Sequence, residues 1–207
     1  DTHPSLAVAE LMRILMDEHQ SLAAIIHAIR HMIGEIEAGR LQPDHKLLEA
    51  MVHYLDAYPE KRHHPKEDEF LFGPLRARTH DADAALDRLE AEHADAEARI
   101  AVLEAAVKAY AQDPAKFDAF KAAFEDYAAF YRTHMMTEER EVLPQIRKHF
   151  TAEDWDRANA GFIADDPLSG TRATARAGEE DFAQIFSRLV AAAPAPIGLG
   201  AGPYKAE

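Results

Sequence analysis

The chain has 207 residues, of which 29% are charged and 47% apolar, a composition typical of a globular protein and not of a disordered one. Its formal net charge of -14 argues against a nucleic-acid partner or an anionic membrane surface, because both require a positive footprint. The lack of cysteine excludes disulfides, thiolate metal sites and a cysteine nucleophile.

The sequence also carries no targeting or membrane signal that we recognise. No segment approaches the roughly 18 unbroken apolar residues needed to span a bilayer. The first residues, Asp1-Thr2-His3-Pro4, lack a basic start and a long apolar core, so no signal peptide is expected. A cytoplasmic location is therefore the default expectation, and a monomer is the default oligomeric state.

The first predicted helix runs from about Pro4, a residue suited to a first helical turn, to a stop at Gly39. Its core-facing residues recur at alternating steps of four and three, as in a helix of a bundle. One member of this seam is a histidine. The seam consists of Val8, Met12, Leu15, His19, Leu22, Ile26, Ile29, Ile33 and Ile36.

A second helix is predicted to begin at Pro43-Asp44. Pro59 and Pro65 then interrupt the backbone hydrogen bonding that a regular helix needs. We therefore expect a kinked or locally unwound helix, which carries His63 and Glu67.

The third and fourth predicted helices again have a polar residue inside an apolar seam. Gly73-Pro74 and the segment around Thr79-His80-Asp81 mark the turn into the third helix, and Asp113-Pro114 supplies a cap and a first-turn proline for the fourth. The third seam consists of Leu86, Leu89, His93, Ala96, Ile100, Leu103, Val107 and Tyr110. The fourth consists of Phe117, Phe120, Phe124, Tyr127, Tyr131, His134 and Glu138.

Four long helices with short connections predict an all-α fold, an up-down-up-down four-helix bundle over residues 1–150. Residues 151–207 have a different character and are expected to form a C-terminal helical extension and an irregular tail, packed on or near the bundle. This part contains a capped segment at Thr151–Trp155, a turn at Asp165–Gly170, an amphipathic segment around Phe182–Leu189, and a tail rich in Ala, Pro and Gly from Ala191.

Two of the seam histidines belong to pairs with a carboxylate one helical turn later. His63 is followed by Glu67, and His134 by Glu138. An acidic chain with twelve histidines produces such pairs by chance, as at His31 and Glu35. The seam positions are more informative, because His19, His63, His93 and His134 fall within one or two turns of a common height in an antiparallel bundle.

This layer would bury four imidazoles and two carboxylates in an apolar core, which is costly unless a cation binds them. Nitrogen and carboxylate ligands without thiolate suit Fe, Mn, Zn or Co, and six ligands are too many for one tetrahedral zinc. We therefore predict two metal ions, foremost a non-haem di-iron centre with Mn or Zn substitution possible. Glu67 and Glu138 are the predicted bridges, with positions left for an oxo or hydroxo bridge and a small ligand.

At these residues the sequence resembles the hemerythrin-like family of HHE cation-binding domains, over about residues 10–150. The matching motifs are Asp17-Glu18-His19, His63-x-x-x-Glu67-Asp68, Glu92-His93 and His134-x-x-x-Glu138-Glu139. The turn at Asp166-Pro167-Leu168 looks like one found in bacterial members. The resemblance implies a di-iron site in a four-helix bundle, used for binding or sensing oxygen, handling nitric oxide or peroxide, or repairing iron-sulfur clusters.

The chain departs from the pattern of oxygen-carrying hemerythrins. The resemblance to that class would imply a His-x-x-x-His pair on the third helix. Here the residues four positions from His93 are Leu89 and Glu97. Those proteins also use an aspartate five residues after the last histidine, where this chain has Glu139. The pattern is closer to di-iron repair and regulatory members, which weighs against simple reversible oxygen carriage.

Several residues keep two interpretations. Either His63 or His64 could be the ligand beside the proline kink; spacing to Glu67 favours His63, and His64 could instead orient a ligand. Glu97 is a possible further ligand, although a solvated acid is favoured. Tyr131 could hydrogen-bond a bound diatomic molecule or be a core tyrosine. The remaining histidines lie off the seams and are expected at the surface: His3, His27, His31, His45, His53, His80 and His149.

Other protein classes also remain open. Ferritin-like di-iron proteins use Glu-x-x-His pairs, and this chain has Glu60-x-x-His63 and Glu90-x-x-His93, but His19 stands where that class uses a glutamate. The remaining alternative is a helical bundle without metal that serves as a protein-interaction module. Within the metal interpretation, the chain either binds or senses O2 or NO, or acts as an enzyme on peroxide or nitric oxide, or takes part in iron-sulfur repair or iron handling.

Overall fold

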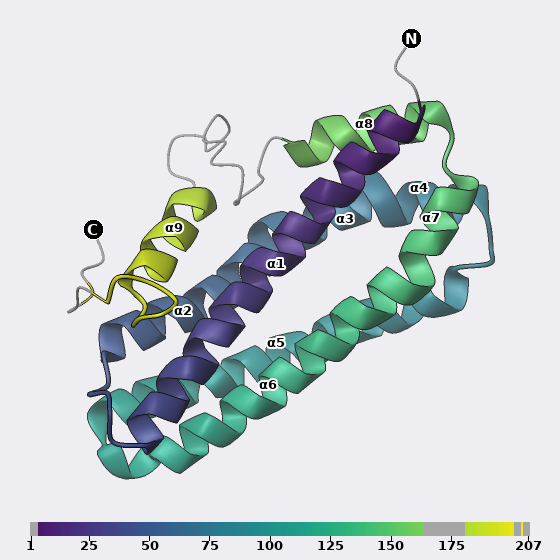
Figure 1. Ribbon diagram of the computed structural model, residues 1–207. Coiled ribbons are helices and arrows are strands. Elements are labelled where there is room, and N and C mark those ends of the chain that lie inside the picture. Colours follow the sequence, from purple (N-terminus) through teal and green to yellow (C-terminus); the bar gives the residue numbers. More distant parts are fainter. Residues whose placement is uncertain (1–3, 164–180, 201–203, 205–207) are drawn as a thin grey trace.

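The computed structural model describes residues 4–163, 181–200 and 204. In that part of the chain every regular element is a helix, and the long helices run antiparallel, side by side (Figure 1), which confirms the predicted all-α bundle. The α-helices are α1 (Pro4–Glu37), α2 (His45–Tyr58), α3 (His64–Glu67), α4 (Gly73–Arg78), α5 (Asp83–Gln112), α6 (Phe117–Thr137), α7 (Leu143–His149), α8 (Ala152–Ile163) and α9 (Phe182–Ala192).

The helix ends follow the capping chemistry in the sequence. The side chain of Asp44 accepts a hydrogen bond from the backbone N–H of Leu47 at 3.1 Å and so caps α2. Asp113 does the same for the 3-10 turn Pro114–Lys116 that leads into α6. After α1, Gly39 has a φ of 75°, a left-handed conformation that glycine adopts without strain.

The second helical segment is interrupted, as predicted. The π-helical turn Pro59–His63 separates α2 from α3, and a second one, Asp68–Phe72, separates α3 from α4. A third π-helical turn, Glu138–Val142, joins α6 to α7 and was not predicted from the sequence. Such wide turns change the direction in which successive side chains point and often occur at functional sites. All three lie beside the histidine layer.

The apolar core is split by this layer into two clusters. On α1 one cluster reaches Leu15 and the other starts at Leu22, with His19 between them. The same gap recurs at one level on the other three long segments: between Tyr58 and Leu71, between Leu89 and Ile100, and between Tyr131 and Val142. Every histidine and carboxylate of the predicted layer falls inside one of these gaps.

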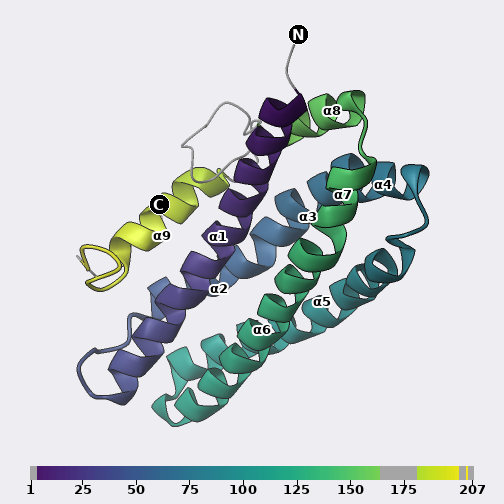
Figure 2. The ribbon, with the colours of Figure 1, turned by 45° about the vertical axis from the view of Figure 1, so that its right-hand side comes forward.

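The C-terminal helices pack on the bundle. Both views show α8 beside the first half of α1, and α9 packs against α1 and α2 (Figures 1 and 2). α8 approaches the second helical segment closely, because a Cβ added at Gly161 would lie 2.4 Å from the ring of Phe70. The predicted turn at Asp165–Gly170, which includes the Asp166-Pro167-Leu168 motif, lies outside the described residues.

The tail predicted to be non-helical from Ala191 is so over the described residues 193–200, whereas Ala191 and Ala192 still belong to α9. The backbone N–H of Tyr204 donates to Asp44 at 2.9 Å and ties the tail to the start of α2. The division into residues 1–150 and 151–207 stays a prediction. Among the described helices, none is both long and apolar enough to cross a membrane.

Candidate metal centre

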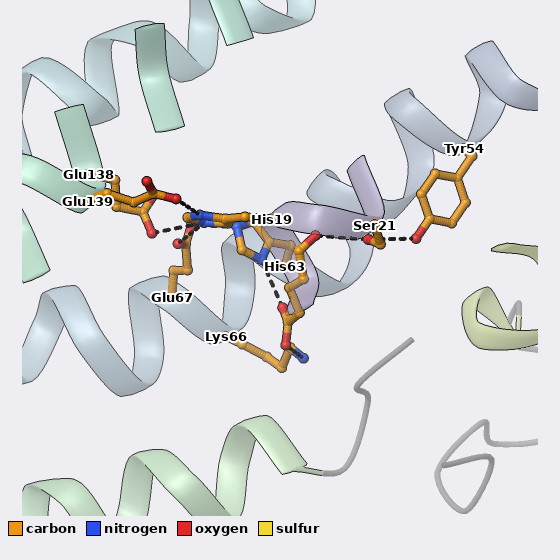
Figure 3. A network of polar contacts seen from close by, with 9 residues as sticks. His19, Ser21, Tyr54, His63, Lys66, Glu67, Glu138 and Glu139 are labelled. Atoms are coloured by element: carbon orange, nitrogen blue, oxygen red, sulfur yellow. Dashed lines mark hydrogen bonds and ion pairs between the residues drawn. The ribbon is translucent and has the colours of Figure 1, made fainter. Parts of the chain in front are cut away.

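The first group of candidate ligands joins three of the four helical segments. It consists of His19 from α1, His63 and Glu67 from the interrupted segment, and Glu138 at the end of α6. Each residue offers an atom within 4.8 Å of the others. His19 Nε2 lies 3.3 Å from Glu138 and 3.7 Å from Glu67, and Figure 3 shows both carboxylates pointing toward this imidazole. All four side chains are buried.

The second group consists of three imidazoles, those of His64, His93 and His134, which also offer atoms within 4.8 Å of one another. His64 and His93 stack with ring centroids 4.3 Å apart, and His134 lies 5.7 Å from His93 by the same measure. The two groups are neighbours, because the rings of His63 and His64 are 5.7 Å apart. Consecutive residues of the interrupted helix thus serve different groups.

Three carboxylates each contact Nδ1 of a different histidine, the ring nitrogen that faces away from the site. Glu18 lies 2.8 Å from Nδ1 of His63, and Glu92 lies 2.7 Å from Nδ1 of His134. Glu139 lies 3.0 Å from Nδ1 of His19. A carboxylate beside Nδ1 accepts a hydrogen bond from its N–H and fixes the ring, so that Nε2 is directed to the site.

The carboxylate on His63 differs from the other two because Glu18 is fully buried. Its second oxygen accepts a hydrogen bond from Nζ of Lys66 at 2.7 Å, and Lys66 is itself only 8% exposed. Lys66 Nζ also lies 5.0 Å from the ring centroid of Phe162 in α8. The C-terminal extension therefore covers a buried ion pair that supports the site (Figure 3).

The electrostatics differ between the two groups. Burial alone would lower the pKa of His63, but the carboxylates of Glu67 and Glu18 raise it to about 9. Burial and the neighbouring Glu67 raise the pKa of Glu138 to about 8. In the second group, burial and the neighbouring His63 lower the pKa of His64 to about 3. A cation must therefore displace protons at the first group, whereas His64 offers a neutral imidazole.

One further observation indicates that these residues are suited to hold a pair of metal ions. Buried polar atoms of both groups have no hydrogen-bond partner among the described residues, although such atoms are nearly always satisfied in native proteins. They are Nε2 of His19, His64 and His93, both carboxylate oxygens of Glu67, and Oε1 of Glu138. Imidazole and carboxylate donors together suit iron, manganese or zinc.

The structure brings together all six residues of the predicted layer and divides them between the two groups: His19, His63, Glu67, His93, His134 and Glu138. It adds His64, which the sequence left undecided, to the second group. Glu97 is exposed and lies outside both groups, and Glu139 hydrogen-bonds a ligand candidate instead of joining a group. Glu90 of the ferritin-like pattern is exposed and paired with Arg76 at 3.1 Å.

The surface prediction for the remaining histidines is wrong in part. His27, His53 and His80 are exposed, but His31, His45 and His149 are half-buried. His45 begins α2 and packs edge-on against Tyr110, near the end of α5, with ring centroids 4.8 Å apart. His3 lies outside the described residues.

Sequence reasoning did not assign the roles of Glu18, Glu92 and Lys66. Glu18 and Glu92 directly precede seam histidines, yet each supports a histidine of a neighbouring helix, His63 and His134. A residue one position before a seam residue lies about 100° around the helix and so faces the adjacent helix. That geometry is the signal that could have identified both carboxylates.

Comparison with known families gives one match. The model of the hemerythrin HHE cation-binding domain matches residues 10–146, well over half of the chain and all residues of both groups. Comparisons with curated proteins and with solved structures find no match.

Proposed function

This chain belongs to the hemerythrin HHE cation-binding family, and from that premise we propose that it is a non-haem di-iron protein that binds or senses a small diatomic ligand, O2 or NO. His19 and His63 would hold one ion and His64, His93 and His134 the other, and Glu67 and Glu138 would supply the carboxylates shared by the pair. The six predicted residues thus gain His64 as a seventh.

The observation that carries the proposal is a set of buried nitrogen and oxygen atoms without a hydrogen bond, at the one level where the apolar core is interrupted on all four segments. Nε2 of His19 has only ion-pair contacts of 3.3 Å with Glu138 and 3.7 Å with Glu67. A buried polar atom left without a hydrogen bond costs about 1–3 kcal/mol. Two cations would satisfy them together, and two carboxylates can each contact both ions.

The protein's own residues position and insulate the centre. Glu18, Glu92 and Glu139 hold three imidazoles in orientation, and the apolar clusters on both sides exclude bulk water. Bound iron would supply a redox-active ion with room for a small exogenous ligand. Tyr131, whose hydroxyl is buried without a partner among the described residues, offers a hydrogen-bond donor near His134, with ring centroids 5.8 Å apart.

The test is metal analysis followed by ligand exposure. The purified protein, reconstituted with Fe2+ without oxygen, is expected to hold two iron ions per chain by elemental analysis. Separate addition of O2, NO and H2O2 is then followed by optical spectra and by product. A stable O2 or NO adduct supports the binding function, whereas continuous consumption of peroxide or nitric oxide supports an enzyme. A chain that retains no transition metal after reconstitution refutes the di-iron proposal.

A further inference from the structure

A cavity of about 210 Å³ lies between the second helical segment, α5 and α6, against the second group of histidines. Its walls include His64 and His93 together with Tyr131. Asp68 and Glu97 also line it, and both are exposed, whereas Tyr131 is only 2% exposed. The cavity therefore leads from the surface into the bundle, as far as two candidate ligands.

The charge along this cavity has one sign. Apart from the two histidines and the two tyrosines, its ionisable lining residues are Asp56, Asp68 and Glu97, all of them carboxylates. A cleft lined by one sign of charge concentrates ions of the opposite sign and repels ions of its own. This lining favours a cation over an anion such as nitrite.

The inner end of the cavity has unpaired polar atoms. Nε2 of His64 and Nε2 of His93 lack hydrogen-bond partners among the described residues, and so does the buried hydroxyl of Tyr131. A hydrated divalent cation carries water molecules that donate hydrogen bonds, and a tyrosine oxygen and carboxylates can accept them. As the cation sheds its water, imidazole nitrogen can replace it.

The side of the site opposite the cavity, around His63, is buried. His63 is 1% exposed, and the buried pair of Glu18 and Lys66 lies behind its ring. Lys66 is covered in turn by Phe162 of α8. On this side the carboxylate of Glu18 is neutralised by Lys66 and both are buried, so they offer an approaching cation neither an exposed surface nor a net negative charge.

We propose that this cavity is the loading route by which a divalent metal cation reaches the centre, with Glu97 and Asp68 as the capture residues at its mouth. The inference rests on the proposed metal centre. It assigns Glu97 a kinetic role, attraction of the incoming ion, and no place among the ligands.

The experiment compares two charge reversals on the same helix. Glu97→Lys places a cation at the mouth, and the matched control Asp95→Lys makes the same change in net charge at an exposed position that does not line the cavity. Metal-free protein is mixed with Co2+, and its binding is followed by visible absorption in a stopped-flow instrument. Elemental analysis gives the final stoichiometry.

The expected effect follows from Coulomb's law. For a divalent cation about 8 Å from the changed charge in water-like surroundings, Glu97→Lys should slow association about ten-fold at about 0.01 M ionic strength. At about 0.15 M, screening should reduce the effect to about three-fold. Asp95→Lys should change the rate much less at either ionic strength, and both variants should reach the wild-type stoichiometry.

Three other results overturn the inference. Equal rates for the two variants would mean that Glu97 does not guide the cation. A lower final stoichiometry in Glu97→Lys would make Glu97 a ligand instead of a capture residue. If the wild-type chain binds neither Co2+ nor Fe2+, the metal centre itself fails, an outcome distinct from a normal stoichiometry with an unchanged rate.

Discussion

The buried pair of Lys66 and Glu18 gives a quantitative prediction about the support of the site. Lys66→Met removes the ammonium group that lies 2.7 Å from Glu18, while methionine can still fill the space beside Phe162. The side chains of Lys66 and Glu18 are 9% and 0% exposed, so water cannot replace the lost partner. The carboxylate then keeps its contact with His63, at 2.8 Å.

Removal of one partner from a buried ion pair costs about 3–5 kcal/mol. Because His63 still bonds Glu18, we expect the lower end, a loss of about 3 kcal/mol in the free energy of unfolding. For a chain of this size that loss lowers the melting temperature by about 6–12 °C. The double variant Lys66→Met with Glu18→Gln removes both charges and should recover at least half of the loss.

Urea unfolding of the metal-free protein, in chelator at neutral pH, measures these free energies. Lys46→Met, at an exposed position, serves as the control and should stay within about 0.5 kcal/mol of the wild type. The reasoning is refuted if Lys66→Met costs no more than this control. It is also refuted if the double variant is no more stable than Lys66→Met alone.

Three further predictions concern two candidate ligands and the carboxyl group of Glu104 on α5. Glu138→Ala should lower the iron content measured by elemental analysis, because it removes a buried carboxylate of the first group. The exposed His27→Ala should not lower it, and equal effects would contradict the predicted layer. His64→Ala should lower the metal content toward a single ion, and full retention would return His64 to a supporting role. Burial and the neighbouring Asp56 raise the pKa of Glu104 from 4.5 to about 7. The folded state then keeps a proton that the unfolded chain releases, so this group's contribution to stability is present below about pH 4.5 and is lost as the pH rises through about 7. Glu104→Gln should thus stabilise the metal-free protein by about 1 kcal/mol at pH 8, a value reduced for solvent exposure, and by almost nothing at pH 4. Urea unfolding at both pH values checks this, and an equal effect at both would exclude the shifted group as the cause.

Much of the fold could be predicted because the seams are periodic. Nearly every apolar seam residue is buried; of the exceptions, Val8 and Phe117 lie near helix ends, and Ala96, in the middle of α5, lines the cavity. Proline positions predicted the interrupted second segment, because a proline cannot donate a backbone hydrogen bond. The π-helical turn Glu138–Val142 was missed, although Pro144 follows it by two residues, as Pro65 and Pro74 follow the other two turns. Each of these prolines lacks the backbone N–H that a regular helix needs at this place.

The residues of the candidate site could be predicted from the sequence, but their distribution between the two groups could not. Seam positions identified residues such as His19 and Glu138, since a polar residue in an apolar seam is recognisable in one dimension. They could not tell whether His63 or His64 faces the layer. Both do, because the π-helical turns beside them alter the direction of successive side chains.

The sequence by itself determined the bundle and the level of the polar layer, because helix periodicity relates residue number directly to face and height. Only the tertiary structure decided which helix supplies each partner: Glu18 supports His63, Glu92 supports His134, and Lys66 neutralises Glu18 beneath α8. These contacts join residues far apart in the chain. Their geometry depends on how neighbouring helices are rotated and tilted against one another, which no local pattern encodes.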